Sequence, residues 1–254
     1  MRIFLKTEDE IILLRAASQL ATRALIEVGR HVVPTVALSH LRKMVVSAVA
    51  KTFSCESSPL SVVKSSHIEL TFYVNGLPVA SSLESACLLS QDDCLTVVCW
   101  ACHKGYYSYA AHTFLLGGSR NAATLLQSYR QAMLQVVQKA VAGHSLKEMS
   151  HTLQTLTRHE QYLLHETFGH GVGRSKVEQP SLLLFSYGLN QDVLLKEGMC
   201  LVIAPVINSD PCLFNCSCES RVATFHNPFV PFGTTVVVRS GRPEILTSFE
   251  TIQK

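Results

Sequence analysis

Apolar residues recur at helical spacing in two long stretches of the chain. In the first, Thr7 and Glu10 have the spacing of a helix capping box, and the apolar positions that follow predict a helix from about residue 8 to residue 30. In the second, the spacing predicts a helix over 121–141. The apolar positions are Leu14, Ala17, Ala21, Ala24 and Val28 in the first stretch, and Leu125, Tyr129, Met133, Val136 and Val137 in the second.

A shorter helix is predicted after each long one. Pro34 breaks the chain after the first, and a second helix is expected over 36–51. Gly143 ends the other long helix, and Ser145 with Glu148 has the spacing of a second capping box, so a helix to about Arg158 follows.

Strand patterns follow each helix pair. Residues 66–74 and 94–101 are rich in β-branched and apolar residues, and 106–116 returns after the turn Lys104–Gly105, which predicts a hairpin. Further strands are expected over 198–207 and 234–239.

The order of helix, helix and strands therefore occurs twice. The junction at 33–41 parallels the one at 142–149, which indicates an internal duplication of about 120 residues. We expect an α+β protein with one domain over 1–254, in which halves of about 1–118 and 119–254 share an antiparallel sheet covered by helices.

Composition narrows the class of protein. Hydrophobic residues make up 47% of the 254 residues and charged residues 16%, against about 25% charged in an average domain. This composition excludes disorder, and a net charge of +3 argues against nucleic acid or membrane as a partner. Charged residues occur within the first ten positions, too early for the apolar core of a signal peptide, and no apolar run is long enough to span a membrane. These features predict a cytoplasmic protein. We attribute the charge shortage to an apolar surface covered by a partner or by a second copy of the chain.

The nine cysteines are interpreted as free thiols in a reducing compartment. Cys99–His103 has the spacing of a haem attachment site, but that chemistry requires export. His165–His170 resembles a zinc-protease motif, but its histidines are five residues apart and a helix needs four. A structural zinc site that uses Cys212, Cys216 and Cys218 stays open as the weaker alternative to ordinary thiols.

Several motifs, in order along the whole chain, resemble the methionine aminopeptidases. The opening 6–21 is similar to the start of that family, and Asn75–Pro78 resembles its His-Gly-Ile-Pro. The hairpin motif at 105–117 and Gly169–Arg174 with Glu178–Pro180 also match, and Gly198–Pro205 resembles the family's Gly-Met…Glu-Pro. This resemblance implies the pita-bread fold, which is pseudo-symmetric, as the duplication independently predicts.

The resemblance also implies a site for two divalent metals, such as Co, Mn, Fe or Zn, held by two Asp, one His and two Glu. Carried over by position, the five ligands fall on Val98, Tyr109, His170, Ala204 and Gly233. A one-gap alternative moves the last to Ala223. The two substrate-side histidines fall on Asn75 and Val177. Only His170 keeps the family's residue, so we expect no metal cofactor and no catalytic residue.

Neighbouring groups are not expected to rebuild the site. Cys99 and His112 should point to the opposite face of the sheet from Val98 and Tyr109, because strand side chains alternate. His170 itself is interpreted as a hydrogen-bonded residue of a glycine-rich loop, whose glycines permit close backbone approach.

Three functions are weighed on this basis. The first is an inactive aminopeptidase-like protein that serves as a protein- or peptide-binding module. The second is a functional methionine aminopeptidase with an atypical metal site, and the third is a retained peptide pocket without hydrolysis. The resemblance includes non-enzymatic relatives in chromatin and ribosome-associated roles. A homo-oligomer stays possible.

Overall fold

The computed structural model describes residues 2–55, 66–117, 120–158, 163–184, 192–208 and 228–248. Cys212, Cys216, Cys218 and Ala223 lie outside these residues. The helices are α1 (Glu8–His31), α2 (Leu38–Cys55), α4 (Arg120–Gln138) and α5 (Leu146–Thr157), with a 3-10 turn η1 (Ser81–Leu83). The strands are β1 (Ser66–Val74), β2 (Leu77–Pro78), β3 (Cys94–His103), β4 (Tyr106–Leu115), β5 (Leu163–Leu164), β6 (Thr167–Gly171), β7 (Glu178–Leu183), β8 (Cys200–Ile203), β9 (Ile207–Asn208), β10 (Pro228–Phe229), β11 (Thr234–Val237) and β12 (Glu244–Ile245).

The helix α1 begins at the predicted capping box. The Thr7 hydroxyl accepts a hydrogen bond from the Glu10 amide at 3.3 Å, and the Glu10 carboxylate accepts one from the Thr7 amide at 3.0 Å. The box predicted at α5 is only half formed. Ser145 accepts from the Glu148 amide at 3.2 Å, but the Glu148 carboxylate lies 3.4 Å from His144 instead of returning to the cap.

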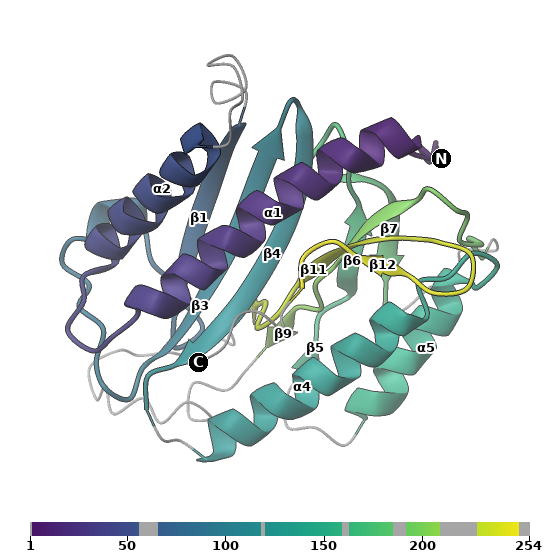
Figure 1. The fold of residues 1–254 in the computed structure, drawn as a ribbon. Helices are drawn as coiled ribbons and strands as arrows, with labels where there is room; N and C mark the ends of the chain where they lie inside the picture. The colour runs from purple at the N-terminus through teal and green to yellow at the C-terminus, as the bar shows by residue number, and fades with distance from the viewer. Residues whose placement is uncertain are drawn as a thin grey trace.

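The first sheet has the order β2-β1-β3-β4, all antiparallel, and contains the predicted hairpin. One of its faces packs on α1 and α2, which lie side by side over it (Figure 1). The core there includes Ala21, Leu25, Phe72, Cys99 and Phe114, each at most 2% exposed. The apolar stripe of α1 is therefore buried as its spacing predicts.

The second sheet has the order β12-β11-β8-β6-β7, and α4 and α5 run along this half of the molecule (Figure 1). The strands β6 and β7 were not predicted, because two glycines in β6 and Pro180 in β7 hide the strand pattern. Gly169 is needed there, since a Cβ would collide with the Val202 carbonyl of β8. The strand expected over 198–207 is divided into β8 and β9, with Pro205 in the interruption. A small third sheet has the order β10-β9-β5.

The second helix of each predicted half begins with the same kind of backbone contact. Before α2, the Leu38 amide donates to the Cys87 carbonyl at 3.2 Å. Before α5, the Leu146 amide donates in the same way to the Val193 carbonyl at 3.0 Å. The internal duplication stays a prediction of the sequence.

The two large sheets meet between β4 and β11. Ala111 and Gly233 exchange two backbone hydrogen bonds, of 2.9 Å and 3.1 Å. The Thr235 hydroxyl adds two bonds to the Tyr109 backbone, each 2.9 Å long. We call this junction the seam. Among the described residues, no helix is long and apolar enough to cross a lipid bilayer.

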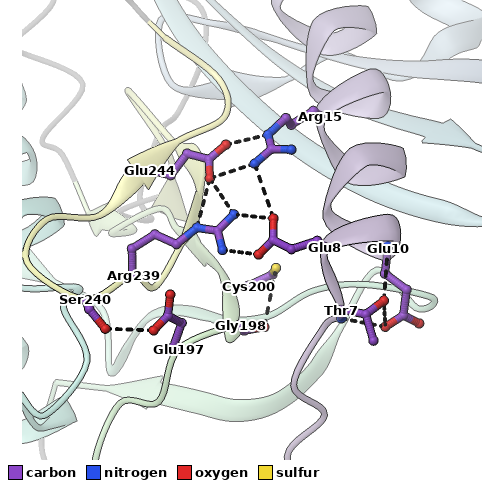
Figure 2. Close-up of polar contacts among 10 residues, drawn as sticks. All are labelled: Thr7, Glu8, Glu10, Arg15, Glu197, Gly198, Cys200, Arg239, Ser240 and Glu244. Atoms are coloured by element: carbon purple, nitrogen blue, oxygen red, sulfur yellow. Dashed lines mark hydrogen bonds and ion pairs between the residues drawn. The ribbon is translucent and has the colours of Figure 1, made fainter.

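An ion-pair network ties α1 to β12, on the second sheet (Figure 2). The Glu244 carboxylate accepts from Arg15 at 2.5 Å and 3.1 Å and from Arg239 at 2.9 Å and 3.0 Å. Arg239 also pairs with Glu8 near the start of α1. The hydrogen bonds from Arg15 and Arg239 lower the pKa of Glu244.

We predict that Glu244→Gln lowers the free energy of unfolding at pH 7 by about 1–2 kcal/mol, because it removes the charge from four hydrogen bonds. A depressed carboxylate pKa stabilises the fold above the ordinary glutamate pKa, and this contribution is lost as the pH falls through the folded value. The difference between variant and wild type should therefore shrink below about pH 4.3. Urea unfolding between pH 7 and pH 3 measures it. The control is Glu197→Gln, because the Glu197 carboxylate accepts a hydrogen bond from the Ser240 hydroxyl at 2.7 Å and has no ion pair among the described residues. An equal loss of unfolding free energy in Glu244→Gln and Glu197→Gln would contradict the stabilising role of the Glu244 ion pairs.

Candidate functional site

All five positions carried over from the aminopeptidases meet at the seam. Val98 lies on β3 and Tyr109 on β4, while His170 lies on β6, Ala204 follows β8 and Gly233 precedes β11. Val98, Tyr109 and Ala204 are 6–8% exposed and belong to one buried apolar cluster, with Ile11, Leu14, Val172 and Val202 around them. The structure thus brings together the five positions that the resemblance named.

The Tyr109 ring occupies the space beside Gly233. A Cβ at Gly233 would collide with the edge of this ring and would lie 3.0 Å from the Cβ of Ala204. The residues at 109 and 233 are therefore sterically matched, because a larger side chain at 233 would need the volume that the tyrosine fills. Burial raises the pKa of the Tyr109 phenol, which stays neutral.

His170 lies on strand β6, paired with Val202 of β8, and not in the loop that the glycines around it predicted. The close-approach role of those glycines is confirmed, since a Cβ on Gly171 would collide with the Gln179 carbonyl. The imidazole Nδ1 lies 2.8 Å from the Gly171 carbonyl, which fixes the ring. Burial lowers the pKa of His170, so the ring is neutral at pH 7.

Trp100 connects His170 to Tyr109. Its ring stacks on the imidazole at 6.1 Å between centroids with a 12° interplanar angle, and it meets the Tyr109 ring edge-on at 4.9 Å. Sequence reasoning missed Trp100 as a site residue. The signal was available, because Trp100 lies two residues after Val98 on one strand and so shares its face.

Cys99 and His112 lie on the other side of the sheet, as their strand phase predicts. Cys99 is buried in the core under α1, and His112 packs on the rings of Phe114 at 4.8 Å and Phe232 at 5.1 Å. Burial raises the pKa of the Cys99 thiol and lowers that of His112 to about 3. Neither side chain belongs to the buried apolar cluster that contains Val98, Tyr109 and Ala204.

The two substrate-side positions are not part of this cluster. Asn75 lies in the β1–β2 turn, where its amide donates to Asp93 at 2.8 Å and accepts from the Cys94 amide at 2.9 Å. Its side chain holds the turn. Val177 comes just before β7 and is 64% exposed.

The side chains at the seam do not fit a pair of divalent cations. Val98, Ala204 and Gly233 offer no side-chain donor atom, and a neutral phenol is a weak ligand for a hard cation. In the described ranges, no three His, Cys, Asp or Glu side chains gather into a metal-binding group. The cysteine pattern at Cys99–Cys102 lies within β3, and its two thiols are free and buried.

Comparison with known proteins agrees with this architecture. The model of metallopeptidase family M24 matches residues 12–239. The methionine aminopeptidase of Clostridium acetobutylicum is 27% identical over 259 residues, which cover 98% of this chain and 100% of that protein. The crystal structure of methionine aminopeptidase from Thermotoga maritima has a TM-score of 0.74 at 21% identity and covers 97% of this chain and 100% of that one. The N-terminal domain of the FACT complex subunit SPT16 from chickpea has a TM-score of 0.70 at 15% identity, over 98% of this chain and 59% of that one.

The fold is thus the α+β pita-bread fold. The chain belongs to metallopeptidase family M24, and within that family it is methionine aminopeptidase-like.

Proposed function

We propose that this protein is a catalytically inactive, methionine aminopeptidase-like protein that binds a protein or peptide partner in the cytoplasm without a metal cofactor. The observation that carries the proposal is the apolar packing at the seam. Val98, Tyr109 and Ala204 form one buried cluster, and the Tyr109 ring takes the volume that a side chain at Gly233 would need. A cluster of metal-binding carboxylates would repel itself without cations, whereas this apolar packing stabilises the fold without them.

The free thiols support the proposed cytoplasmic location, and the composition of the surface supports the proposed protein or peptide partner. Five cysteines are free thiols, as is usual in a reducing compartment: Cys87, Cys94, Cys99, Cys102 and Cys200. The low content of charged residues, 16%, favours a protein interface over phosphate binding, and large apolar side chains lie exposed. They include Phe4, Leu5, Ile12, Val33, Val46, Leu83, Leu88, Val177, Leu194 and Ile245.

The second candidate is an active aminopeptidase with an atypical metal site. The retained His170 and the methionine aminopeptidases among the relatives favour it. One imidazole is the only strong ligand at the five seam positions, so this activity would need donors from elsewhere.

A peptidase assay separates the two. The purified chain is supplied with Co²⁺ or Mn²⁺ and incubated with Met-Ala-Ser, and the released methionine is measured. We expect no turnover above the buffer blank. The matched control is His170→Ala, which should behave identically. Release of methionine by the wild type that His170→Ala abolishes would overturn the proposal.

A further inference from the structure

A lysine of this chain is held in a corner of aromatic and acidic side chains next to the seam. The Lys176 ammonium lies 2.5 Å from the Glu69 carboxylate. It also lies 5.8 Å from the ring centroid of Trp100 and 5.9 Å from that of Tyr107. Two rings and a carboxylate around one ammonium are the groups that recognise an alkylammonium, through cation–π attraction and a charge-assisted hydrogen bond. We call Glu69, Trp100 and Tyr107 the ammonium corner.

The strand register builds this corner. Glu69 of β1 pairs with Trp100 of β3, and Trp100 pairs with Tyr109 of β4, so these three form one row across the sheet. Tyr107 is two residues before Tyr109 and therefore shares its face. His170 stacks on Trp100 and Tyr109 meets its edge, which together fix the indole plane. The corner is thus preorganised by the residues that fill the seam.

The ammonium comes from a different part of the chain. Lys176 belongs to the connection between β6 and β7, which crosses to the hairpin where the Tyr107 amide donates to the Gly173 carbonyl at 2.8 Å. The side chain of Glu69 is 52% exposed and that of Lys176 is 36% exposed, so solvent reaches the corner. Val177, beside Lys176, is 64% exposed and offers an apolar contact next to the corner.

We propose that the ammonium corner is a binding site for a lysine side chain of a peptide or protein partner, and that Lys176 occupies it as an internal competitor. This inference rests on the proposed function, because it names the chemistry of the partner. The exposed pair of Lys176 and Glu69 contributes little to stability, so an external lysine can displace Lys176 without unfolding the chain. Because the β6–β7 connection keeps Lys176 beside the corner, the ammonium has a millimolar effective concentration there. Removing the Lys176 side chain should therefore strengthen peptide binding.

Trp100 is the only tryptophan of the chain, so intrinsic fluorescence reports on the corner directly. The probe is the peptide acetyl-Gly-Ala-Lys-Ala-Gly-amide, and its partner peptide has norleucine in place of lysine. We expect a saturable fluorescence change with the lysine peptide only. Lys176→Ala should tighten its binding by about three- to fivefold, as the internal competitor is lost. The matched control is Lys43→Ala on α2, which should leave the affinity unchanged.

The role of Glu69 is tested in the Lys176→Ala background, where no internal lysine competes. Adding Glu69→Gln should weaken binding of the lysine peptide at least tenfold, measured by calorimetry. A free-amine peptide without lysine, Gly-Ala-Ala-Ala-Gly-amide, is expected not to bind, which separates a lysine side chain from a chain N-terminus. Far-UV circular dichroism verifies that each variant is folded.

Equal behaviour of the lysine and norleucine peptides, or an affinity that Lys176→Ala leaves unchanged, would overturn the inference. In that case the proposed function would still stand if the chain shows no peptidase turnover. Turnover that depends on His170 would overturn the proposed function, and peptide binding at the corner would then be assigned to substrate recognition.

Discussion

Tyr109→Ala should lower the free energy of unfolding by about 3–5 kcal/mol, because the ring is buried at the seam and its removal leaves a cavity. Gly233→Ala in the wild-type background should cost about 1–3 kcal/mol, since its Cβ collides with the same ring. The double variant should lose less than the sum of the two, by at least about 1 kcal/mol, because the methyl group enters the space that the ring leaves. Urea denaturation of the four proteins measures this cycle.

The control is the same cycle with Tyr107→Ala. Tyr107 lies on the same face of β4 but is only half-buried, and the space beside Gly233 is filled by Tyr109. We expect the effects of Tyr107→Ala and Gly233→Ala to add. Additive effects in the Tyr109 cycle as well would contradict the steric matching of Tyr109 and Gly233.

Val98→Asp should also destabilise the protein severely, by several kcal/mol at pH 7, because it buries a carboxylate among apolar side chains. Such a carboxyl has a pKa raised by burial above its value of about 3.9 in the unfolded chain. The folded state then holds a proton that the unfolded state has released, so stability falls as the pH rises above about 3.9. This trend is opposite to the one expected for Glu244.

Val98→Asn is the matched control, with similar shape and no charge. It should be destabilising at every pH, without the loss that accompanies a rise in pH. Thermal unfolding between pH 3.5 and pH 7.5 compares the two variants. A Val98→Asp protein as stable at pH 7.5 as Val98→Asn would show that a cation or a basic group compensates the carboxylate.

The elements with local signals were predictable from the sequence. The capping box at Thr7 and Glu10 fixes the start of α1, and β1 spans the predicted residues 66–74. Alternation along β3 and β4 correctly placed Cys99 and His112 on the face opposite Val98 and Tyr109. These features depend on the spacing of residues within one element, which a sequence contains directly.

The features that were missed depend on contacts between distant segments. Gly169 and Pro180 masked the strand pattern of β6 and β7, because these residues usually weaken strands. Gly169 is required here by the close approach of β8, and Pro180 is tolerated because β7 is the edge strand of its sheet. The resemblance placed Tyr109 and Gly233 at one site, but only the structure shows that the ring of one fills the space of the other. Likewise, no local pattern predicts that the Lys176 ammonium contacts the Glu69 carboxylate, because the two residues are 107 positions apart in the sequence.

If the seam binds no divalent metal, the thermal midpoint of unfolding is the same with and without 1 mM MnCl₂. A site with a dissociation constant of about 10 μM would stabilise the fold by about 2.7 kcal/mol at this concentration. That would raise the midpoint by about 5–11 °C for a chain of this size. We predict no rise, either in the wild type or in His170→Ala. A rise in the wild type that His170→Ala removes would contradict the account.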